Sequence, residues 1–575
     1  MHNRVSVPSI KRLRDMEEKK IKYPIGVQTF DKIIEGEYLY IDKTGFVHDL
    51  ATNYSYVFLS RPRRFGKSLL SSTFHSYFEG RDDLFKGLKA GELKDEWTKH
   101  PVLHFDMSTA KHCNEVELLS ELNIKLLKYE KIYGKGDCEV GVNQRFEGLV
   151  HRAVEQTGEK AVIIIDEYDA PLLDVVNNQE RLTPMRQIMR NFYSPIKSLD
   201  PYLRFVFITG ITKFAQLSIF SELNNLKNIS MMPKYSAVCG ISQEELQTQM
   251  NIPVQEMADE LEISFDAALE KLKSNYDGYH FCAKSEDIYN PFSLLNSLSD
   301  KMFGSYWFDT ATPTFLIERM REDPIPENLL DRMNEIARSD FDVSPEFSDS
   351  ILPLLYQTGY LTIKGYSAED ESYTLGYPNR EVREGFLKGL LNSYRGSEGM
   401  SASFVLQFNK ALKNNDIDGA LERMKSFLAG IPYDLENKSE KHFQTIIYLI
   451  FSLLGYYTQA EVKSAIGRAD AVCRTKDRIY VFEFKMDGSA EEALKQIDEK
   501  GYLIPYRFEG ASDNSEAALV AEPVTKPVAE PVEATGWATG RDASASSASN
   551  KTLVKVGINI STQTRTIDSW KVAIE

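Results

Sequence analysis

The stretch Tyr56-Val-Phe-Leu-Ser-Arg-Pro-Arg-Arg-Phe-Gly-Lys-Ser68 decides the fold of the first part of this 575-residue chain. Its apolar start predicts a buried strand, and the pattern at 69–78 predicts a helix after it. Gly-Lys-Ser between a strand and a helix is typical of a P-loop, where backbone N–H groups at the helix start hold phosphate. The standard loop has glycine where this chain has Arg61. The stretch therefore predicts nucleotide binding, and an ordinary helix start is the alternative.

Four residues of this loop are expected to bind ATP and its metal ion. Lys67 would reach the outer phosphates, and Ser68 would ligate Mg²⁺. Arg64 and Gly66 complete the predicted ATP-binding residues of the loop.

A second apolar run ends in two carboxylates. Ala161-Val-Ile-Ile-Ile165 leads directly into Asp166 and Glu167. Because ligands bind at the carboxyl ends of strands in open α/β sheets, we expect Asp166 to hold Mg²⁺ through its water shell and Glu167 to orient or deprotonate the attacking water. A strand must also end in something polar, which is the structural alternative. Thr209, after the apolar run at 204–208, either senses the γ-phosphate or simply ends its strand.

Patterns along the chain predict three regions and an α/β fold class. Strand-like runs alternating with amphipathic segments predict a P-loop domain with a parallel sheet at 1–240. Helical periodicity dominates the middle region, 241–400, and helices followed by strands predict a C-terminal α/β domain at 401–575. Within it, 511–550 has one leucine and no isoleucine, phenylalanine or tyrosine. Such a segment cannot bury enough apolar surface to fold, so it is predicted to be a disordered insertion.

The C-terminal region contains a predicted β-hairpin that carries charged residues. Two strand-like segments flank a polar turn at Lys476-Asp477. In a hairpin with this two-residue turn, the residue numbers of any two residues that face each other across the strands add up to the same value. This rule places Asp470 opposite Glu483. Lys485 shares the face of Glu483, while the phenylalanines on either side of Glu483 point to the other face.

This hairpin predicts a metal site. Opposed carboxylates are hard oxygen ligands for Mg²⁺, and Lys485 would position a water or stabilise developing charge. Glu440 begins an apolar helix upstream and is a further candidate metal ligand, and Gln496 lies on the predicted helix at 490–500. The alternative is a solvated strand face with an ordinary Glu–Lys pair.

Bulk composition sets limits on location and partners. The chain has 68 basic and 84 acidic residues, and the net charge of −16 disfavours nucleic acid unless a basic groove forms locally. No stretch reaches the roughly 18 consecutive apolar residues that span a membrane, so no membrane partner is expected. The five cysteines lack metal-ligand spacing, and the N-terminus is polar rather than signal-like. These features predict a cytoplasmic location.

Together the motifs resemble a bacterial family in which an AAA-ATPase-like domain is fused to a C-terminal PD-(D/E)XK nuclease-superfamily domain. The form of the phosphate loop with Arg61 is typical of that family. The resemblance implies ATP-site roles for Lys67, Ser68, Asp166 and Glu167, and nuclease roles for the Asp-Glu-Lys set of the hairpin. The segments that carry it include Arg61-Pro-Arg-Arg-Phe-Gly-Lys-Ser68, Ile165-Asp-Glu-Tyr-Asp169, Tyr276-Asp-Gly-Tyr279, Gly467-Arg-Ala-Asp470 and Phe482-Glu-Phe-Lys485.

Three functions fit this architecture. The leading one is an ATP-regulated, Mg²⁺-dependent nuclease with catalytic Glu167, Asp470, Glu483 and Lys485, with DNA favoured over RNA as its substrate. In the second, ATP drives a switch whose nuclease-like domain binds nucleic acid or a partner without cleaving. In the third, the insertion disables the C-terminal domain and leaves an ATP-binding protein. A homo-oligomer is compatible with each of them.

Overall fold

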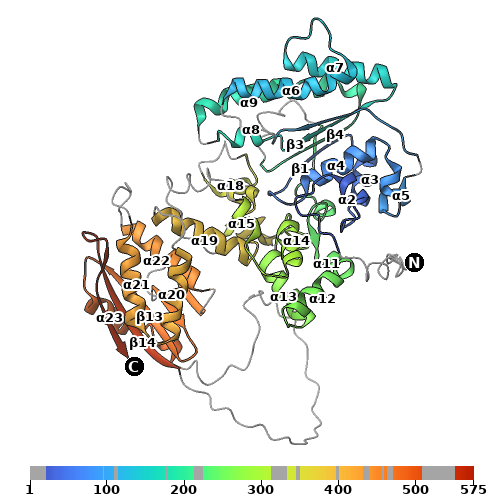
Figure 1. Cartoon of the computed structure of the whole chain (residues 1–575). Coiled ribbons are helices and arrows are strands. Elements are labelled where there is room, and N and C mark those ends of the chain that lie inside the picture. The colour runs from blue at the N-terminus through green and yellow to red at the C-terminus, as the bar shows by residue number, and fades with distance from the viewer. Residues whose placement is uncertain are drawn as a thin grey trace, which may run out of the picture. The chain divides into compact units, whose positions relative to one another are not determined.

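The computed structural model of the chain (Figure 1) describes residues 21–94, 96–108, 114–176, 178–212, 225–311, 333–344, 350–395, 401–431, 440–455, 459–462, 470–507 and 551–575. The chain forms two compact units, Met1–Phe386 and Leu387–Glu575. The domain boundaries expected at 240 and 400 remain predictions. The insertion predicted at 511–550 lies outside the described residues.

The first unit contains a parallel five-stranded sheet in the order β2-β3-β4-β1-β5. Every residue of the second strand along this order is buried. Its run of valine and isoleucine explains this, because strands covered on both faces are apolar throughout and β-branched residues favour strands. The strands are β1 (Tyr56–Ser60), β2 (Val102–Asp106), β3 (Ala161–Asp166), β4 (Leu203–Gly210) and β5 (Lys227–Asn228).

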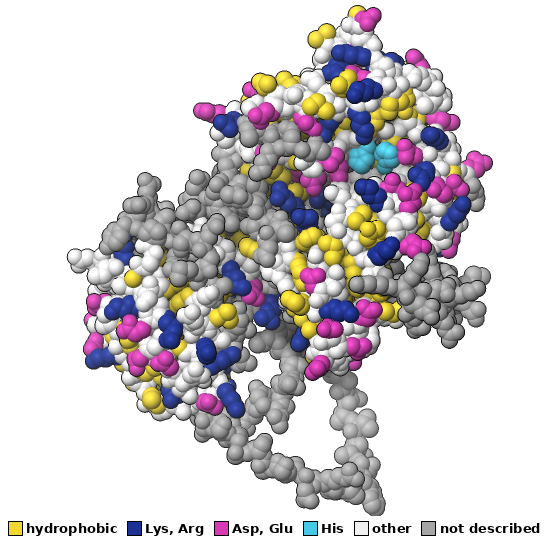
Figure 2. Space-filling view, in the orientation of Figure 1, with side chains coloured by type: hydrophobic (Ala, Val, Ile, Leu, Met, Phe, Trp, Pro, Cys, Tyr) yellow, Lys and Arg dark blue, Asp and Glu magenta, His cyan; other side chains and the backbone are white. Residues whose placement is uncertain are grey.

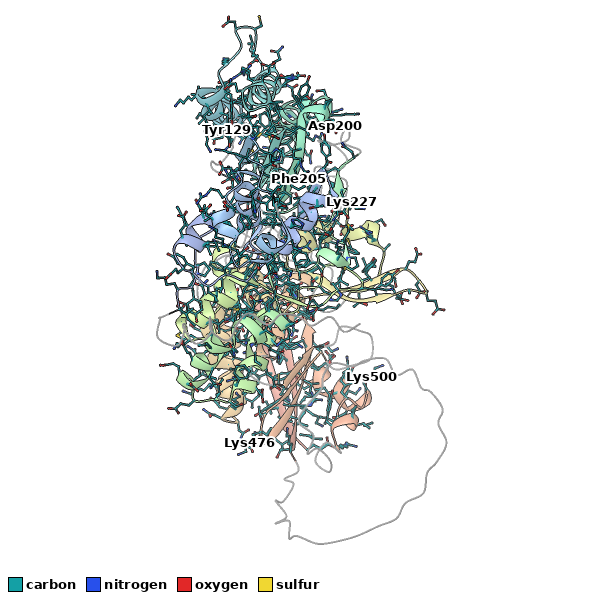
Figure 3. All side chains as sticks on the ribbon, turned by 90° about the vertical axis from the view of Figure 1, so that its right-hand side faces the viewer. Tyr129, Asp200, Phe205, Lys227, Lys476 and Lys500 are labelled. Atoms are coloured by element: carbon teal, nitrogen blue, oxygen red, sulfur yellow. The ribbon has the colours of Figure 1, made fainter. Side chains whose placement is uncertain are left out.

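Helices cover both faces of this sheet. On one face, Phe146 and Phe192 pack against Phe105 of β2. On the other, Phe74 packs against Phe205 of β4, which is fully buried and is labelled in Figure 3. The first face is covered by α6 (Glu115–Tyr133), α7 (Val142–Thr157) and α9 (Gln179–Tyr193), and the second by α4 (Lys67–Phe78). The other helices of this part are α2 (Phe30–Glu35), α3 (Thr44–Asn53), α5 (Lys89–Leu93), α8 (Ala170–Leu173) and α10 (Pro195–Ser198).

The rest of the first unit is mainly helical, as predicted. Its helices are α11 (Gln243–Gln249), α12 (Asn251–Glu260), α13 (Phe265–Tyr276), α14 (Pro291–Asp300), α15 (Tyr306–Ala311), α17 (Arg338–Phe341) and α18 (Leu352–Thr358), and the boundary between the two units falls within α19 (Arg380–Arg395). Two small antiparallel sheets were not predicted, because their strands are too short to show a clear alternation. They are formed by β6 (Ile241–Ser242) with β7 (Ile288–Tyr289), and by β8 (Met333–Ile336), β10 (Ser372–Gly376) and β9 (Thr362–Ser367).

The second unit is built around a mixed sheet in the order β11-β12-β13-β14-β15, in which only β13 and β14 run parallel. Strand β14 pairs with the whole length of β13. Strands β11 and β15 were not predicted. The elements are α20 (Ser401–Lys413), α21 (Ile417–Ala429), α22 (Glu440–Leu454), β11 (Gln459–Val462), β12 (Ala471–Arg474), β13 (Arg478–Met486), α23 (Ala490–Glu499), β14 (Thr552–Ser561) and β15 (Thr566–Ile574).

Among the described residues, no helix is long and apolar enough to cross a membrane.

Candidate functional site

The loop between β1 and α4 leads directly from the end of the strand to the start of the helix. Arg64 and Gly66 both adopt left-handed conformations, with φ of 67° and 86°. Gly66 precedes the first residue of α4, and its carbonyl accepts the hydrogen bond from Leu70 at 3.0 Å. The buried Lys67 folds back over the loop, where its amino group donates to the carbonyl of Pro62 at 3.2 Å. The predicted strand, loop and helix are therefore present, with the lysine inside the loop.

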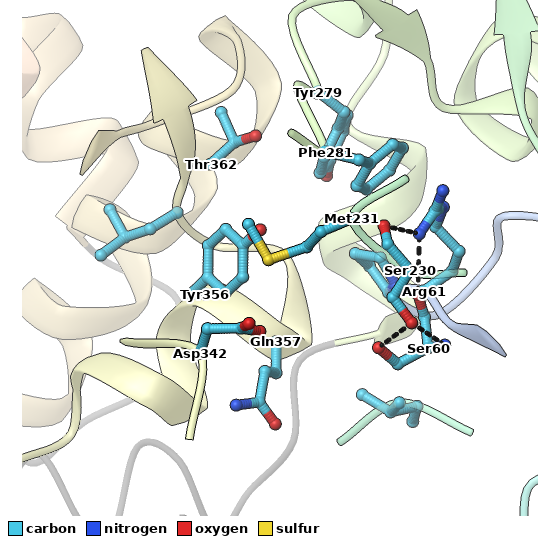
Figure 4. Close-up of a pocket in the computed structure, with 13 residues that line it drawn as sticks. Ser60, Arg61, Ser230, Met231, Tyr279, Phe281, Asp342, Tyr356, Gln357 and Thr362 are labelled. Carbon is cyan, nitrogen blue, oxygen red and sulfur yellow. Dashed lines mark hydrogen bonds between the residues drawn. The ribbon is translucent and has the colours of Figure 1, made fainter. Parts of the chain in front are cut away.

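Arg61 occupies the glycine position of the standard motif but does not face the loop interior. Its guanidinium donates to the carbonyls of Ser60 and Ser230 at 3.0 and 2.7 Å (Figure 4), and to that of Tyr235 at 3.2 Å. It also stacks 4.0 Å from the ring centre of Phe281. The cavity beside it, about 30 Å³, has room only for water-sized molecules. Arg61 therefore anchors the loop instead of binding a ligand.

The helical part of the first unit also contacts this loop. The indole of Trp307 donates to the carbonyl of Arg63 at 3.1 Å, and the ring of Phe65 meets that of Tyr279 edge-on. A side chain on Gly359 would come within 2.6 Å of Pro62. The loop is thus packed against residues far from it in the sequence.

The carboxyl ends of β3 and β4 bring the remaining predicted residues to the loop. The side chain of Asp166 lies near that of Ser68, which follows Lys67 at the start of α4. The Oδ1 atom of Asp166 and the hydroxyl of Thr209 are buried and have no hydrogen-bond partner among the described residues. Burial, with the charges of Glu167 and Asp106, raises the pKa of Asp166 to about 7. A buried carboxylate oxygen without a partner fits a site that a hydrated Mg²⁺ would complete.

Two acidic residues after β3 have different surroundings. Glu167 is half-buried and has a φ of 49°, in the left-handed region that is uncommon for non-glycine residues. Asp169 is fully buried and accepts hydrogen bonds from the backbone N–H groups of Ile211 and Thr212 at 3.1 and 2.6 Å. It joins the turn after β3 to the end of β4, so its role is structural.

An apolar cavity lies beside the phosphate loop. It measures about 90 Å³, several times the space that one water needs. Gly66 and Leu69 form the side nearest the loop, and Tyr40, Cys239 and Leu295 come from three separate segments. The sequence did not reveal this cavity, because its walls are brought together only by the fold.

In the second unit, the hairpin has the predicted register. Residues Lys476 and Asp477 form the turn, and β12 pairs with β13 so that Ala471 lies opposite Phe482. Extending this register by one residue sets Asp470 opposite Glu483. The carboxylate of Asp470 accepts a hydrogen bond from the backbone N–H of Phe484 at 2.8 Å.

The two faces of β13 are divided as predicted. Phe482 and Phe484 pack against Phe451 of α22, with ring centres 4.9 and 5.9 Å away. Glu483 and Lys485 point to the opposite face, where α23 lies. The apolar face holds the strand on α22 and leaves the charged face to the other helix.

Gln496 of α23 links the charged residues. Its side-chain amide donates to Glu483 Oε1, and its carbonyl accepts a hydrogen bond from Lys485. The amino group of Lys485 lies 3.6 Å from the same Glu483 oxygen, and the hydroxyl of Tyr502 is 3.4 Å from the Gln496 amide. Ser489 caps the helix that carries Gln496. Sequence reasoning placed Gln496 on this helix but missed Tyr502.

The carboxylates of this face favour a bound cation. Glu483 is 2% exposed, and its Oε2 atom has no partner among the described residues. Burial, followed by the charge of Asp470, raises the pKa of Glu483 to about 7, and Lys485 partly offsets this. Burial also raises the pKa of Asp470. The donor set therefore fits a divalent metal, which would stabilise both carboxylates in their charged form.

One glycine, Gly557 of β14, allows α23 to approach this face. It lies beside Glu483 in the sheet, and a Cβ there would come within 2.4 Å of the Ala490 carbonyl and 2.9 Å of the Leu494 nitrogen. Sequence reasoning missed it, because it follows a long low-complexity segment. The remaining candidate ligand, Glu440, begins α22, and its side chain is outside the described parts.

Comparisons with known proteins match both regions of the chain in which these residues lie. A family model described as a predicted AAA-ATPase matches residues 24–220, and one described as the PD-(D/E)XK nuclease superfamily matches residues 438–525. A protein of Azotobacter chroococcum mcd 1, described as an uncharacterized protein in the vnfD 5' region, is 34% identical over 507 residues, which cover 86% of this chain and 95% of that protein. The chain therefore belongs to the family that joins an AAA-ATPase-like domain to a C-terminal PD-(D/E)XK nuclease-superfamily domain.

Proposed function

We propose that this protein binds ATP at the β1–α4 loop and cleaves nucleic-acid phosphodiester bonds, in a Mg²⁺-dependent reaction, at the charged face of β13. One observation carries the proposal. Each site contains a buried carboxylate oxygen without a partner, Asp166 Oδ1 or Glu483 Oε2, beside a lysine. Such an oxygen is costly in a folded protein unless a ligand completes it.

At the loop, the backbone at Gly66 and the amino group of Lys67 would hold the phosphates. Ser68 and Asp166 would hold Mg²⁺, and Glu167 would orient the attacking water if ATP is hydrolysed. Thr209, whose buried hydroxyl has no hydrogen-bond partner among the described residues, would sense the γ-phosphate. The apolar cavity beside Gly66 suits the base of the nucleotide.

At the hairpin, Asp470 and Glu483 would be the metal ligands, with Glu440 as a further candidate. When bound, Mg²⁺ polarises the phosphate and lowers the pKa of a coordinated water. Lys485 would stabilise the negative charge that develops on the phosphate, and Gln496 fixes the position of both Lys485 and Glu483.

The partner is proposed to be nucleic acid, because the C-terminal domain belongs to a nuclease superfamily. We propose DNA over RNA as its substrate, and the cleavage assay below decides between them. A cytoplasmic location is also proposed. It is supported by Cys138, Cys239, Cys282 and Cys473, which are the described cysteines and are all free thiols.

The test is cleavage of single- and double-stranded DNA and RNA with Mg²⁺ or Mn²⁺, with and without ATP. Wild type is compared with Glu483→Gln and with Glu499→Gln, a control on the exposed side of α23. Loss of cleavage only in Glu483→Gln, together with a change on adding ATP, is expected. A folded, ATP-binding wild type that cleaves none of these substrates would favour the switch, in which the second unit binds without cutting.

A regulatory role for ATP is tested separately with Lys67→Ala. This variant should lose ATP binding and the effect of ATP on cleavage while keeping its metal-dependent basal cleavage. If basal cleavage responds to ATP equally in Lys67→Ala and wild type, the loop does not regulate the nuclease site.

A further inference from the structure

Helix α6 exposes a row of large apolar side chains. Its inner face buries Leu118, Leu122 and Leu126 against the sheet of the first unit. On the outer face, Val116 is 77% exposed and Ile124 is 59% exposed. Two further apolar residues of this face, Leu119 and Leu127, are 37% and 47% exposed. The helix is therefore apolar on two faces, which one sheet cannot cover.

The exposed residues form one continuous surface. Val116, Ser120 and Leu127 follow the helical repeat on one side of α6, and Leu119 and Ile124 flank them. Together with Asn123 they line a shallow hollow. In Figure 2, apolar side chains are visible on the surface over this helix layer. Contiguous apolar surface of this kind marks an interaction site more often than isolated exposed residues do.

Charged residues lie at both ends of the row, acidic at the start of the helix and basic near its end. Glu115 and Glu117 are exposed in the first turn, and Lys128 and Lys131 are exposed near the end. This order also suits the helix dipole. The dipole accounts for the charges at the two ends, but it does not account for the apolar row between them.

We propose that this row is covered by α6 of a second copy of the chain, packed antiparallel about a twofold axis. In that arrangement, the acidic end of each helix lies beside the basic end of the other, so Glu117 of one copy is close to Lys128 of the other. The apolar residues then meet along the middle. A parallel arrangement would instead place like charges together, and the apolar row with its acidic end does not suit nucleic acid.

The contact is expected to be weak. One pair of helices buries less than the roughly 1,200–2,000 Å² of a standard interface. A dimer that forms in the micromolar concentration range, and that dissociates on dilution, is the expected behaviour.

The first test is sedimentation velocity of the full chain over a range of concentrations. The double variant Ile124→Asp/Leu127→Asp should weaken the dimer by at least about 100-fold, because two acidic groups would be buried against apolar surface. Val140→Asp is the matched control, since Val140 is 84% exposed but lies outside α6. A monomeric wild type, or a dimer unchanged by the double variant, would overturn the proposal.

A charge exchange tests the antiparallel geometry without touching the apolar row. Glu117→Lys and Lys128→Glu should each weaken self-association by about tenfold, since each replaces two attractive contacts with two repulsive ones. A mixture of the two variants should associate as wild type does, because both contacts become attractive again. Failure of the mixture to associate more tightly than either variant alone would refute this pairing.

Discussion

Replacing Arg61 tests whether this residue anchors the phosphate loop. From the standard motif alone, glycine is expected to suit this position of the loop better than arginine. The structure predicts the opposite, because the guanidinium bridges β1 to the segment at 230–236. The substitution Arg61→Met keeps the apolar stem and removes the hydrogen bonds. It leaves the carbonyls of Ser230 and Tyr235 without this donor.

The size of the effect follows from the contacts. Three of the hydrogen bonds from Arg61 are 3.2 Å or shorter. Bonds from a charged donor contribute roughly 1.5–3 kcal/mol each, and a desolvated cation–π contact about 2 kcal/mol. Burial opposes them: it lowers the pKa of Arg61 to about 10, a net shift that corresponds to about 3 kcal/mol against the charged form. With the lower values for the hydrogen bonds, Arg61→Met is expected to lower the free energy of local unfolding by about 3 kcal/mol.

Hydrogen exchange of the peptides that cover β1 and residues 227–236 measures this loss locally. A loss of about 3 kcal/mol speeds exchange through local opening by more than about 100-fold. Arg64→Met is the control, since Arg64 lies three residues away and is exposed. Exchange in Arg61→Met within about threefold of that in Arg64→Met would show that the buried guanidinium does not hold the loop.

Three other perturbations address the two sites. The pKa of Asp166 is raised to about 7 in the folded state, so folding favours the protonated carboxyl. The stability that the protonated carboxyl contributes is fully present below pH about 4 and is lost as the pH rises through 7. Asp166→Asn should therefore raise the free energy of unfolding at pH 8 by up to about 4 kcal/mol and change it little at pH 4, as measured by denaturant unfolding without nucleotide. Gly557→Ala should destabilise the second unit by about 1–3 kcal/mol, because α23 must move away from the sheet. Gly365→Ala, where the new Cβ would lie 3.5 Å from Thr374, is its control in thermal unfolding. Cys239→Phe, which fills the apolar cavity, should weaken binding of ATP but not of inorganic triphosphate, as measured by calorimetry. Equal losses of affinity for the two ligands would show that the base does not bind in this cavity.

Much of both sites could be predicted because their residues are close in the sequence. The two-residue turn at Lys476-Asp477 fixes the register of its hairpin, so the pairing of Asp470 with Glu483 needed no knowledge of the rest of the fold. Likewise, alternation along a strand separates Phe482 from Glu483. The phosphate loop is also local, since a strand, a loop and a helix follow one another.

The rest depends on contacts between distant segments. The partners of Arg61 lie about 170 residues away in the sequence, and the sequence gives no sign of them. Gly557 acts through α23, from which the 511–550 segment separates it. Strand β11 has only four residues, so its alternation of polar and apolar residues is too short to indicate a strand.

The two lysines of the proposed sites differ in a way that matters for their chemistry. Lys485 contacts Glu483 directly and shares Gln496 with it, so this lysine partly offsets the burial of its carboxylate. Lys67 instead donates to the Pro62 carbonyl, and its charge lowers the pKa of Asp166 less than Glu167 raises it. Phosphate oxygens at the loop would be stronger acceptors for Lys67 than a neutral carbonyl is. The amino group of Lys67 therefore gains a better partner when a nucleotide binds, whereas Lys485 is already held in place beside Glu483.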